Sequence, residues 1–214
     1  MSTYGFENYS LQVGKKKLIT NLNIDFQSGV ISHLFGSNGV GKSCFAKSCL
    51  NIIKYTGKIQ TTCKPVLLGS YSNIPTDLRL KDVLNFMKKK YKCHYVKELY
   101  ELLELNMIPS SLKIKHMSDG QKQKVKLFAF LSKRPEIIIL DEFTNALDKK
   151  STLDIYQFLL KYVKQENAIC INITHNLADI EYMPGSYYLL ANKTITQISN
   201  KEKIIEMYVK GGMI

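Results

Sequence analysis

The sequence predicts an α/β fold, a mixed central sheet with flanking helices, and three observations carry this prediction. Short, mainly apolar runs recur along the chain at 30–35, 66–69, 137–140 and 168–173. Runs of this length and composition are typical of parallel strands that are buried on both faces. Segments with helical apolar spacing lie between the runs, and a glycine-rich loop follows the first of them. Such alternation predicts crossover helices that cover the sheet.

The first part of the chain predicts a small antiparallel sheet. Residues 4–13 and 18–26 read as two strands, and the turn at Gly14 joins them. We expect this sheet to lie beside the main one, flanking a ligand site.

The loop at 36–43 reads Gly-Ser-Asn-Gly-Val-Gly-Lys-Ser and leads into a helix that we expect to begin near Gly41. Its glycines let the backbone turn sharply, so that several N–H groups and the helix N-terminus point at a triphosphate. Lys42 is expected to reach the β- and γ-phosphates, and the Ser43 hydroxyl to ligate Mg²⁺. The alternative is an ordinary strand-to-helix turn. The candidate nucleotide-binding residues of the loop are Gly36, Ser37, Asn38, Gly39, Val40, Gly41, Lys42, Ser43 and Cys44.

After the run at 66–69, the chain is expected to be mainly helical over 80–105, ending before Pro109. A further helix follows Met117-Ser118-Asp119-Gly120-Gln121, because apolar residues recur at helical spacing over 122–132. Its N-terminus offers a second place for phosphate. The serine that introduces it can equally be an ordinary N-cap.

The run at 136–140 ends in two carboxylates, Asp141 and Glu142. A central parallel strand delivers such groups to the edge of a phosphate site, where Asp141 would hold Mg²⁺ through water and Glu142 would polarise the attacking water. A strand followed by a solvated acidic turn is the alternative.

The run at 168–173 ends in Thr174-His175-Asn176. A lone histidine is usually a structural residue, but His175 at the end of a strand beside a phosphate site could contact the γ-phosphate. Residues 186–191 and 194–198 then predict a hairpin, and 201–209 a final helix.

Taken together, these segments resemble the nucleotide-binding subunit of ATP-binding cassette (ABC) systems. Residues 36–43 correspond to that family's Walker A motif, 137–142 to Walker B, 117–121 to the signature motif, Asn145-Ala146-Leu147-Asp148 to the D-loop, and His175 to the switch histidine. The resemblance runs from about Phe6 to beyond His175. It implies a P-loop NTPase fold in a single domain, residues 1–214, with an antiparallel β-subdomain and a small helical subdomain at about 71–134.

The resemblance also implies a shared catalytic site. Two subunits would pair head to tail, so that ATP on the Walker A loop of one meets Ser118, Gly120 and Gln121 of the other. Catalysis would fall to Lys42, which neutralises phosphate charge, Glu142, which orients water, and His175, which contacts the γ-phosphate. Ser43 and Asp141 would be the metal residues, and the implied cofactors are ATP and Mg²⁺.

Three departures from the family pattern bear on the site. Asp119 replaces a glycine of the signature motif, where a carboxylate would repel phosphate unless it turns away. The family's glutamine after the second core strand is missing, and Tyr71 or a neighbour would stand in its place. The aromatic residue that stacks on adenine would fall near Val13; Tyr9 is the nearest aromatic, but we expect it in the core.

Composition restricts the classes of protein that fit. The net charge is +12, and the local lysine run at 88–92 reads as a solvated helix end, with attraction to anionic lipid as the second interpretation. No interleaving of aromatic and basic residues indicates a nucleic-acid groove, so no nucleic acid is expected. The five cysteines lack Cys-x-x-Cys spacing, which favours buried, reduced thiols over disulfides or zinc.

No apolar stretch approaches the roughly 20 residues that span a bilayer. Residues 1–5 also lack a signal pattern. We therefore expect a cytoplasmic protein, peripheral on the inner face of the cytoplasmic membrane.

The function implied by the resemblance is ATP hydrolysis that energises a membrane transporter. A compact chain without a C-terminal extension is similar to the stand-alone ATPases of exporters, although import stays open. The expected partners are membrane-spanning transporter subunits and a second ATPase subunit, in a homodimer or heterodimer. The alternative is a soluble ABC-type ATPase that acts on DNA or ribosomes, although the fused cassettes or long coiled coil of such proteins are absent. A third is a degenerate module that binds ATP for assembly and scarcely hydrolyses it.

Overall fold

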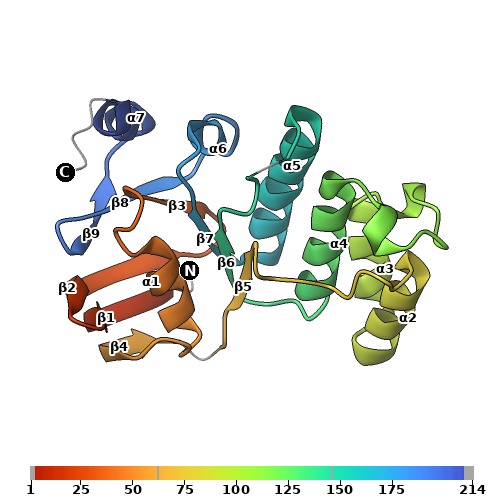
Figure 1. The fold of residues 1–214 in the computed structure, drawn as a ribbon, viewed down its shortest axis with the longest axis horizontal. Helices are drawn as coiled ribbons and strands as arrows, with labels where there is room; N and C mark the ends of the chain where they lie inside the picture. The colour runs from red at the N-terminus through yellow and green to blue at the C-terminus, as the bar shows by residue number, and fades with distance from the viewer. Residues whose placement is uncertain (1–2, 62, 146, 210–214) are drawn as a thin grey trace.

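The computed structural model describes residues 3–61, 63–145 and 147–209, which form two sheets with helices around them (Figure 1). The larger sheet has six strands and the smaller has three. The predicted α/β architecture, with a mixed central sheet and an antiparallel sheet beside it, is confirmed.

The smaller sheet is antiparallel, and its strand order is β2-β1-β4. The predicted hairpin is present as β1 (Thr3–Val13) and β2 (Lys16–Gln27), but the sequence did not indicate β4 (Tyr55–Gln60). Aromatic rings from β1 and β2 pack against Phe45 of helix α1 (Lys42–Cys49). The small sheet therefore supports the helix that follows the glycine-rich loop.

The central sheet has the order β5-β6-β7-β3-β8-β9, in which only the last pair is antiparallel. Its strands are β3 (Ile31–Phe35), β5 (Val66–Gly69), β6 (Ile137–Asp141), β7 (Ile169–Ile173), β8 (Ser186–Ala191) and β9 (Thr194–Ile198). In the register, Gly69 lies opposite Asp141, and Asp141 opposite Ile173. The carboxyl ends of these strands therefore meet at one edge, where ligands bind in open parallel sheets.

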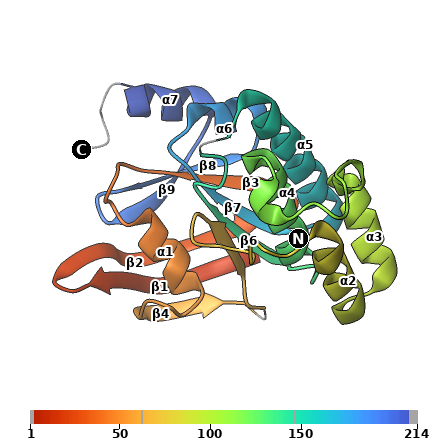
Figure 2. The same cartoon turned by 45° about the vertical axis from the view of Figure 1, so that its right-hand side comes forward.

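The helices lie around this sheet, and three of them gather at one end of the molecule. Figures 1 and 2 both show α2 (Leu80–Lys90), α3 (Cys93–Leu102) and α4 (Asp119–Leu131) together, away from α1 and the small sheet. A short helix after His175, α6 (Leu177–Tyr182), was not expected from the sequence. The other helical elements are η1 (Leu105–Met107), η2 (Ile114–His116), α5 (Lys149–Glu166) and α7 (Lys201–Val209).

Three apolar clusters lie against the central sheet, and two of them contain side chains of β6. Ile137 and Ile139 of β6 join the cluster that includes Phe45 and the small sheet, whereas Ile138 and Leu140 join the cluster that includes α4 and α5. Successive side chains of a strand point to opposite faces, so β6 is buried on both. This burial explains why its sequence is apolar until Asp141.

Within the described residues no disulfide joins the five cysteines, but the expectation that they are buried is wrong for three of them. Cys49 and Cys170 are buried, whereas Cys44 and Cys63 are partly exposed and Cys93 is exposed. Cys93 opens α3, where the first two residues are exposed. Within the described ranges, no helix combines the length and the hydropathy that crossing a bilayer requires.

Candidate functional site

The glycine-rich loop is held open by residues that take left-handed backbone. Gly39 has φ +76° and Gly41, the N-cap of α1, has φ +118°. A Cβ at Gly41 would also lie 3.1 Å from Leu18 Cδ1. Other residues adopt such angles only at an energetic cost, so the loop conformation depends on these glycines.

Lys42 folds back over this loop. Its Nζ donates hydrogen bonds to Gly36 O at 2.7 Å and to Ser37 O at 3.1 Å, and the residue is buried. Burial lowers the pKa of Lys42, and the nearby carboxylates of Glu142 and Asp141 oppose that shift. An ammonium whose hydrogen-bond partners among the described residues are carbonyls, in a partly desolvated position, favours a bound anion.

Asp141 is buried, and each oxygen of its carboxylate accepts a hydrogen bond. Ser43 Oγ donates to Oδ1 at 3.2 Å, and the Tyr71 hydroxyl donates to Oδ2 at 3.1 Å. Burial raises the pKa of Asp141, and both hydrogen bonds counter the shift. The two residues predicted to serve a metal are therefore adjacent, although they lie 98 positions apart in the sequence.

This pair fits Mg²⁺. The described residues contain no group of three or more His, Cys, Asp or Glu that could hold a metal ion alone. Mg²⁺ usually needs only one or two protein oxygens, with the remaining ligands supplied by water and substrate phosphate. Ser43 Oγ and the Asp141 carboxylate are hard oxygen donors of that kind.

Glu142 follows β6 directly and turns out of the strand with φ +51°. Its backbone N–H donates to Ile173 O at 2.9 Å, which joins the ends of β6 and β7. His175 Nδ1 lies 2.9 Å from Glu142 Oε1, and Asn145 Nδ2 donates to Oε2 at 3.1 Å. The structure therefore brings together Glu142 and His175, and it adds Asn145, which sequence reasoning had noted only within the D-loop resemblance.

A cavity of about 320 Å³ lies between the small sheet and the glycine-rich loop, and Lys42, Ser43 and Glu142 are among the residues that line it. Lys16, the first residue of β2, reaches it and donates from Nζ to Gly39 O at 3.1 Å. Sequence reasoning missed Lys16; the lysine run in the hairpin turn was the available signal. The lining residues are Val13, Lys16, Leu18, Asn38, Gly39, Gly41, Lys42, Ser43, Cys44 and Glu142.

Val13 lies at the rim of this cavity and is 42% exposed, whereas Tyr9 is buried in the small sheet. The Tyr9 hydroxyl hydrogen-bonds with Ser48 Oγ at 2.5 Å, inside the aromatic cluster. The expectation that Tyr9 is a core residue is confirmed. At the position where the family has an aromatic residue, the cavity is therefore lined by the aliphatic side chain of Val13.

The signature segment begins α4 with a capping box. Ser118 Oγ accepts from Gln121 N at 3.2 Å, and Gln121 Oε1 accepts from Ser118 N at 3.1 Å. Asp119 turns toward Lys122 on its own helix, with 3.0 Å between Oδ1 and Nζ. In this chain alone, no described hydrogen bond or ion pair links Ser118, Gly120 or Gln121 to the loop at 36–43.

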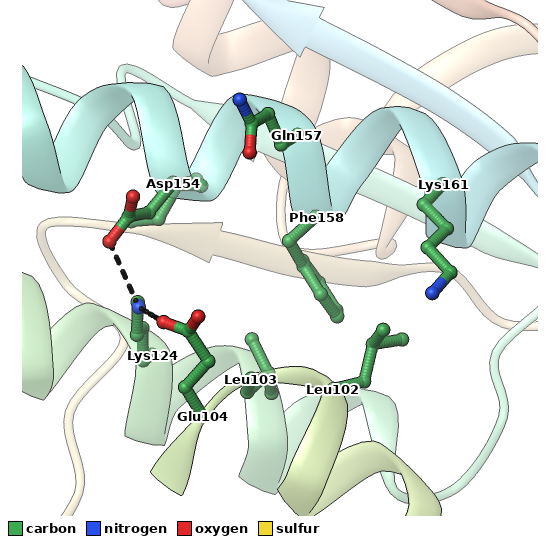
Figure 3. A pocket seen from close by; sticks show the side chains of 9 residues that line it. Leu102, Leu103, Glu104, Lys124, Asp154, Gln157, Phe158 and Lys161 are labelled. Atoms are coloured by element: carbon green, nitrogen blue, oxygen red, sulfur yellow. Dashed lines mark hydrogen bonds and ion pairs between the residues drawn. The ribbon is translucent and has the colours of Figure 1, made fainter. Parts of the chain in front are cut away.

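Three features show that α4 packs closely against Phe143 and α5. Gln123 Nε2 donates to Phe143 O at 2.8 Å, and a Cβ at Gly120 would lie 2.2 Å from Ser151 Oγ, at the start of α5. Figure 3 shows the third contact, in which Lys124 lies between two carboxylates, 2.7 Å from Glu104 Oε2 and 3.1 Å from Asp154 Oδ2. The signature helix and the carboxylate strand therefore form one packed unit.

The predicted D-loop is described except for Ala146, which lies outside the described residues. Asp148 is the N-cap of α5, where its Oδ1 accepts from Ser151 N at 3.0 Å and its Oδ2 from Ser151 Oγ at 2.6 Å. Asn145 and Asp148 thus hold the two ends of the connection between Glu142 and α5.

A buried polar network, which sequence reasoning missed, lies behind the site. His33 Nε2 donates to Met183 O at 2.7 Å, and Asn172 Nδ2 donates both to His33 Nδ1 at 3.2 Å and to Asp179 Oδ2 at 2.9 Å. Asp179 Oδ1 accepts from Thr144 Oγ1 at 3.1 Å and from the Tyr156 hydroxyl. The network therefore connects β3, β7 and α6 to the residues that follow Glu142.

Comparison with known proteins identifies relatives along most of the chain. Residues 19–145 match the family described as ABC transporter. The protein of Bacillus subtilis (strain 168) named "Probable peptide export ATP-binding protein YydI" is 43% identical over 205 residues, which cover 94% of this chain and 97% of that protein. The zinc import ATP-binding protein ZnuC of Psychrobacter cryohalolentis is 29% identical over 176 residues, which cover 79% of this chain and 72% of that protein.

Solved structures support the fold. A structure of the ATP binding subunit of an ABC transporter matches with a TM-score of 0.78 at 18% identity, covering 99% of this chain and 94% of that one. At this identity, the match shows the fold alone.

Proposed function

Because this chain belongs to the ABC transporter family, as an ATP-binding subunit whose ATPase activity is coupled to transport, we propose that two copies enclose ATP between them and that hydrolysis separates them. The observation that carries the proposal is the division of the phosphate-binding groups into two sets. One set surrounds Lys42 and Asp141, and the other is the N-terminus of α4, which has no described bond to the first.

The loop at 36–43 binds the triphosphate of ATP. Its backbone N–H groups and the N-terminus of α1 face the anion, and Lys42 exchanges its carbonyl partners for β- and γ-phosphate oxygens. Ser43 and Asp141 would hold Mg²⁺, which would neutralise part of the phosphate charge.

Glu142 orients the attacking water and accepts its proton. Both of its oxygens already have partners, His175 and Asn145, so the carboxylate has a fixed direction before water arrives. When the γ-phosphate is present, His175 is placed to leave Glu142 and contact that phosphate. The position of the histidine thereby reports whether ATP is intact.

The second copy supplies Ser118, Gly120 and Gln121. The first turn of α4 carries free N–H groups and partial positive charge, which suit the γ-phosphate of a facing protomer. Asp119 does not oppose this arrangement, because its carboxylate is paired with Lys122. Because some contacts with ATP exist only in the closed dimer, ATP binds the closed dimer more tightly than the separate copies. ATP binding therefore shifts the population toward the closed dimer.

The membrane-spanning partner docks on an apolar groove between α2 and α4. The groove measures about 680 Å³, and Phe86 and Leu78 on it are 56% and 37% exposed. Lys90 and Lys133 line the same groove. An amphipathic cytoplasmic segment of a membrane subunit, with apolar and acidic side chains, would cover the apolar surface and pair with these lysines. This partner would hold the protein at the inner face of the cytoplasmic membrane.

The direction of transport that we propose is export, with a peptide as cargo. The support is the relative named for peptide export, which is 43% identical over 94% of this chain and 97% of that protein. The relative named for zinc import shares fewer residues over a shorter part of the chain.

Mixing two inactive variants tests the shared site. Lys42→Ala disables the loop, and Ser118→Arg blocks the helix N-terminus, so neither variant alone should hydrolyse ATP. In a mixed pair, one site combines an intact loop with an intact helix N-terminus, and ATPase activity should return. Activity that stays absent in the mixture, while each variant remains folded by circular dichroism, contradicts the proposal.

Membrane extracts test the partner. A tagged wild-type chain and a Phe86→Ser variant are compared with Met107→Ser, which removes an apolar side chain that is 79% exposed outside the groove. We expect a multi-span membrane protein to bind wild type and Met107→Ser but not Phe86→Ser. Equal recovery with all three proteins would exclude the groove. Uptake of labelled peptide into inverted vesicles that contain the recovered complex then tests the cargo and the direction.

A further inference from the structure

Tyr71 follows β5 in a turn that is closed by its neighbours. Ser72 N donates to Gly69 O at 3.1 Å, while Ser72 Oγ donates to Leu67 O at 3.0 Å and accepts from Gly69 N at 3.1 Å. Ser72 is buried. These three bonds fix the backbone on either side of Tyr71 at the carboxyl end of β5, one strand away from Asp141.

The ring of Tyr71 has a defined place. It lies against the backbone of Gly69, where an added Cβ would be 3.0 Å from the ring carbon that carries the hydroxyl. From α1, Lys47 places its Nζ 5.3 Å from the ring centroid, in a cation–π contact. The ring is therefore located by contacts that do not involve its hydroxyl.

The hydroxyl of Tyr71 reaches Asp141. It donates to Oδ2 at 3.1 Å, while Oδ1 accepts from Ser43. One donor on each oxygen fixes the rotation of the carboxylate, and it keeps Oδ1 on the side of Ser43. Without Tyr71, Oδ2 would be a buried carboxylate oxygen that lacks this donor, and the group would lose that orientation.

We propose that Tyr71 is a positioning residue for the metal site, whose hydroxyl orients the Asp141 carboxylate for the divalent cation that accompanies the nucleotide. The inference rests on the proposed function, since it assigns Ser43 and Asp141 to the cation. Tyr71 acts through Asp141. Its hydroxyl therefore affects the affinity for the cation and leaves the affinity of the loop at 36–43 for phosphate unchanged.

The test separates binding of the nucleotide from binding of the cation. Titration with a fluorescent N-methylanthraniloyl ADP gives the affinity in EDTA, and Mg²⁺ titration at fixed nucleotide gives the half-saturating Mg²⁺ concentration. The variant is Tyr71→Phe, which keeps the ring contacts with Gly69 and Lys47 and removes only the hydroxyl. Tyr182→Phe is the matched control, because it deletes a hydroxyl from an exposed tyrosine outside the site.

For Tyr71→Phe, we expect nucleotide affinity in EDTA within twofold of wild type and a half-saturating Mg²⁺ concentration raised roughly tenfold, the size of a hydrogen bond to a charged group. Tyr182→Phe should match wild type in both. An unchanged or lower Mg²⁺ requirement in Tyr71→Phe, or an equal loss of affinity in EDTA, would overturn the inference. If wild type itself shows no Mg²⁺ dependence, the assignment of the metal site to Ser43 and Asp141 fails as well.

Discussion

Protonation of His33 is expected to destabilise the fold between pH 7 and pH 5. The buried ring donates from Nε2 to Met183 O, so its Nδ1 is the acceptor that faces the Asn172 amide. A proton on Nδ1 would place the Nδ1–H donor opposite the amide donor of Asn172, and the buried site offers no water as an alternative acceptor. Burial lowers the pKa of His33 to about 4, although the Met183 carbonyl and the Asp179 carboxylate oppose that shift.

The sign and size of the effect follow from this pKa. Between pH 6.5 and pH 4, the unfolded chain binds a proton that the folded chain excludes, so stability falls as the pH falls. The shift is worth about 3 kcal/mol in full, and about 2 kcal/mol of it is lost between pH 7 and pH 5.

Urea unfolding at several pH values measures this loss. We expect the wild-type midpoint to fall by roughly 1 M between pH 7 and pH 5, at a typical denaturant dependence. His33→Gln keeps a side-chain donor near Met183 O and removes the titrating ring. That variant is less stable at pH 7 and has a shallower pH dependence. If His33→Gln shows the same fall as wild type, the reasoning about His33 is refuted.

Three further predictions concern the site and its support. Lys42→Ala should weaken ATP binding more than roughly tenfold in a nucleotide titration, because the phosphates lose their charged partner; unchanged affinity contradicts the loop assignment. Gly120→Ala should cost about 1–3 kcal/mol in urea unfolding, since its Cβ would meet Ser151, and Ser151→Gly should restore part of the loss. Lys124→Met should cost about 1 kcal/mol at low salt and less at high salt, because the carboxylates beside Lys124 face solvent; equal cost at both salts argues for packing instead.

The central sheet was predictable because its strands are buried on both faces. β3, β6 and β7 have every residue buried, which requires mainly apolar sequences of strand length. The edge strand β4 was missed because most of its side chains are exposed and its sequence has no apolar run. The short helix α6 was missed because its six residues are too few to show a helical period.

The sequence predicted which residues belong to the candidate site better than it predicted the contacts among them. Lys42, Ser43, Asp141 and Glu142 were found because phosphate and metal chemistry restricts residue types at fixed spacing. Their roles in binding and catalysis, and the bounds of a helical subdomain at 71–134, remain predictions.

The buried network shows what spacing cannot reveal. His33 and Asn172 lie 139 positions apart and meet only because β3 and β7 are neighbours in the sheet. The sequence carries no local signal for such a pair, since each polar residue by itself reads as an interruption of an apolar strand.

The most direct test of the shared site is the mass of the Glu142→Gln variant in solution with ATP and Mg²⁺. This change removes the carboxylate that polarises water and keeps the phosphate contacts, so ATP should stay bound and hold two copies together. Size-exclusion chromatography with light scattering at micromolar protein should report a dimer with ATP and a monomer without it. A monomer that binds ATP as tightly as wild type would contradict the account.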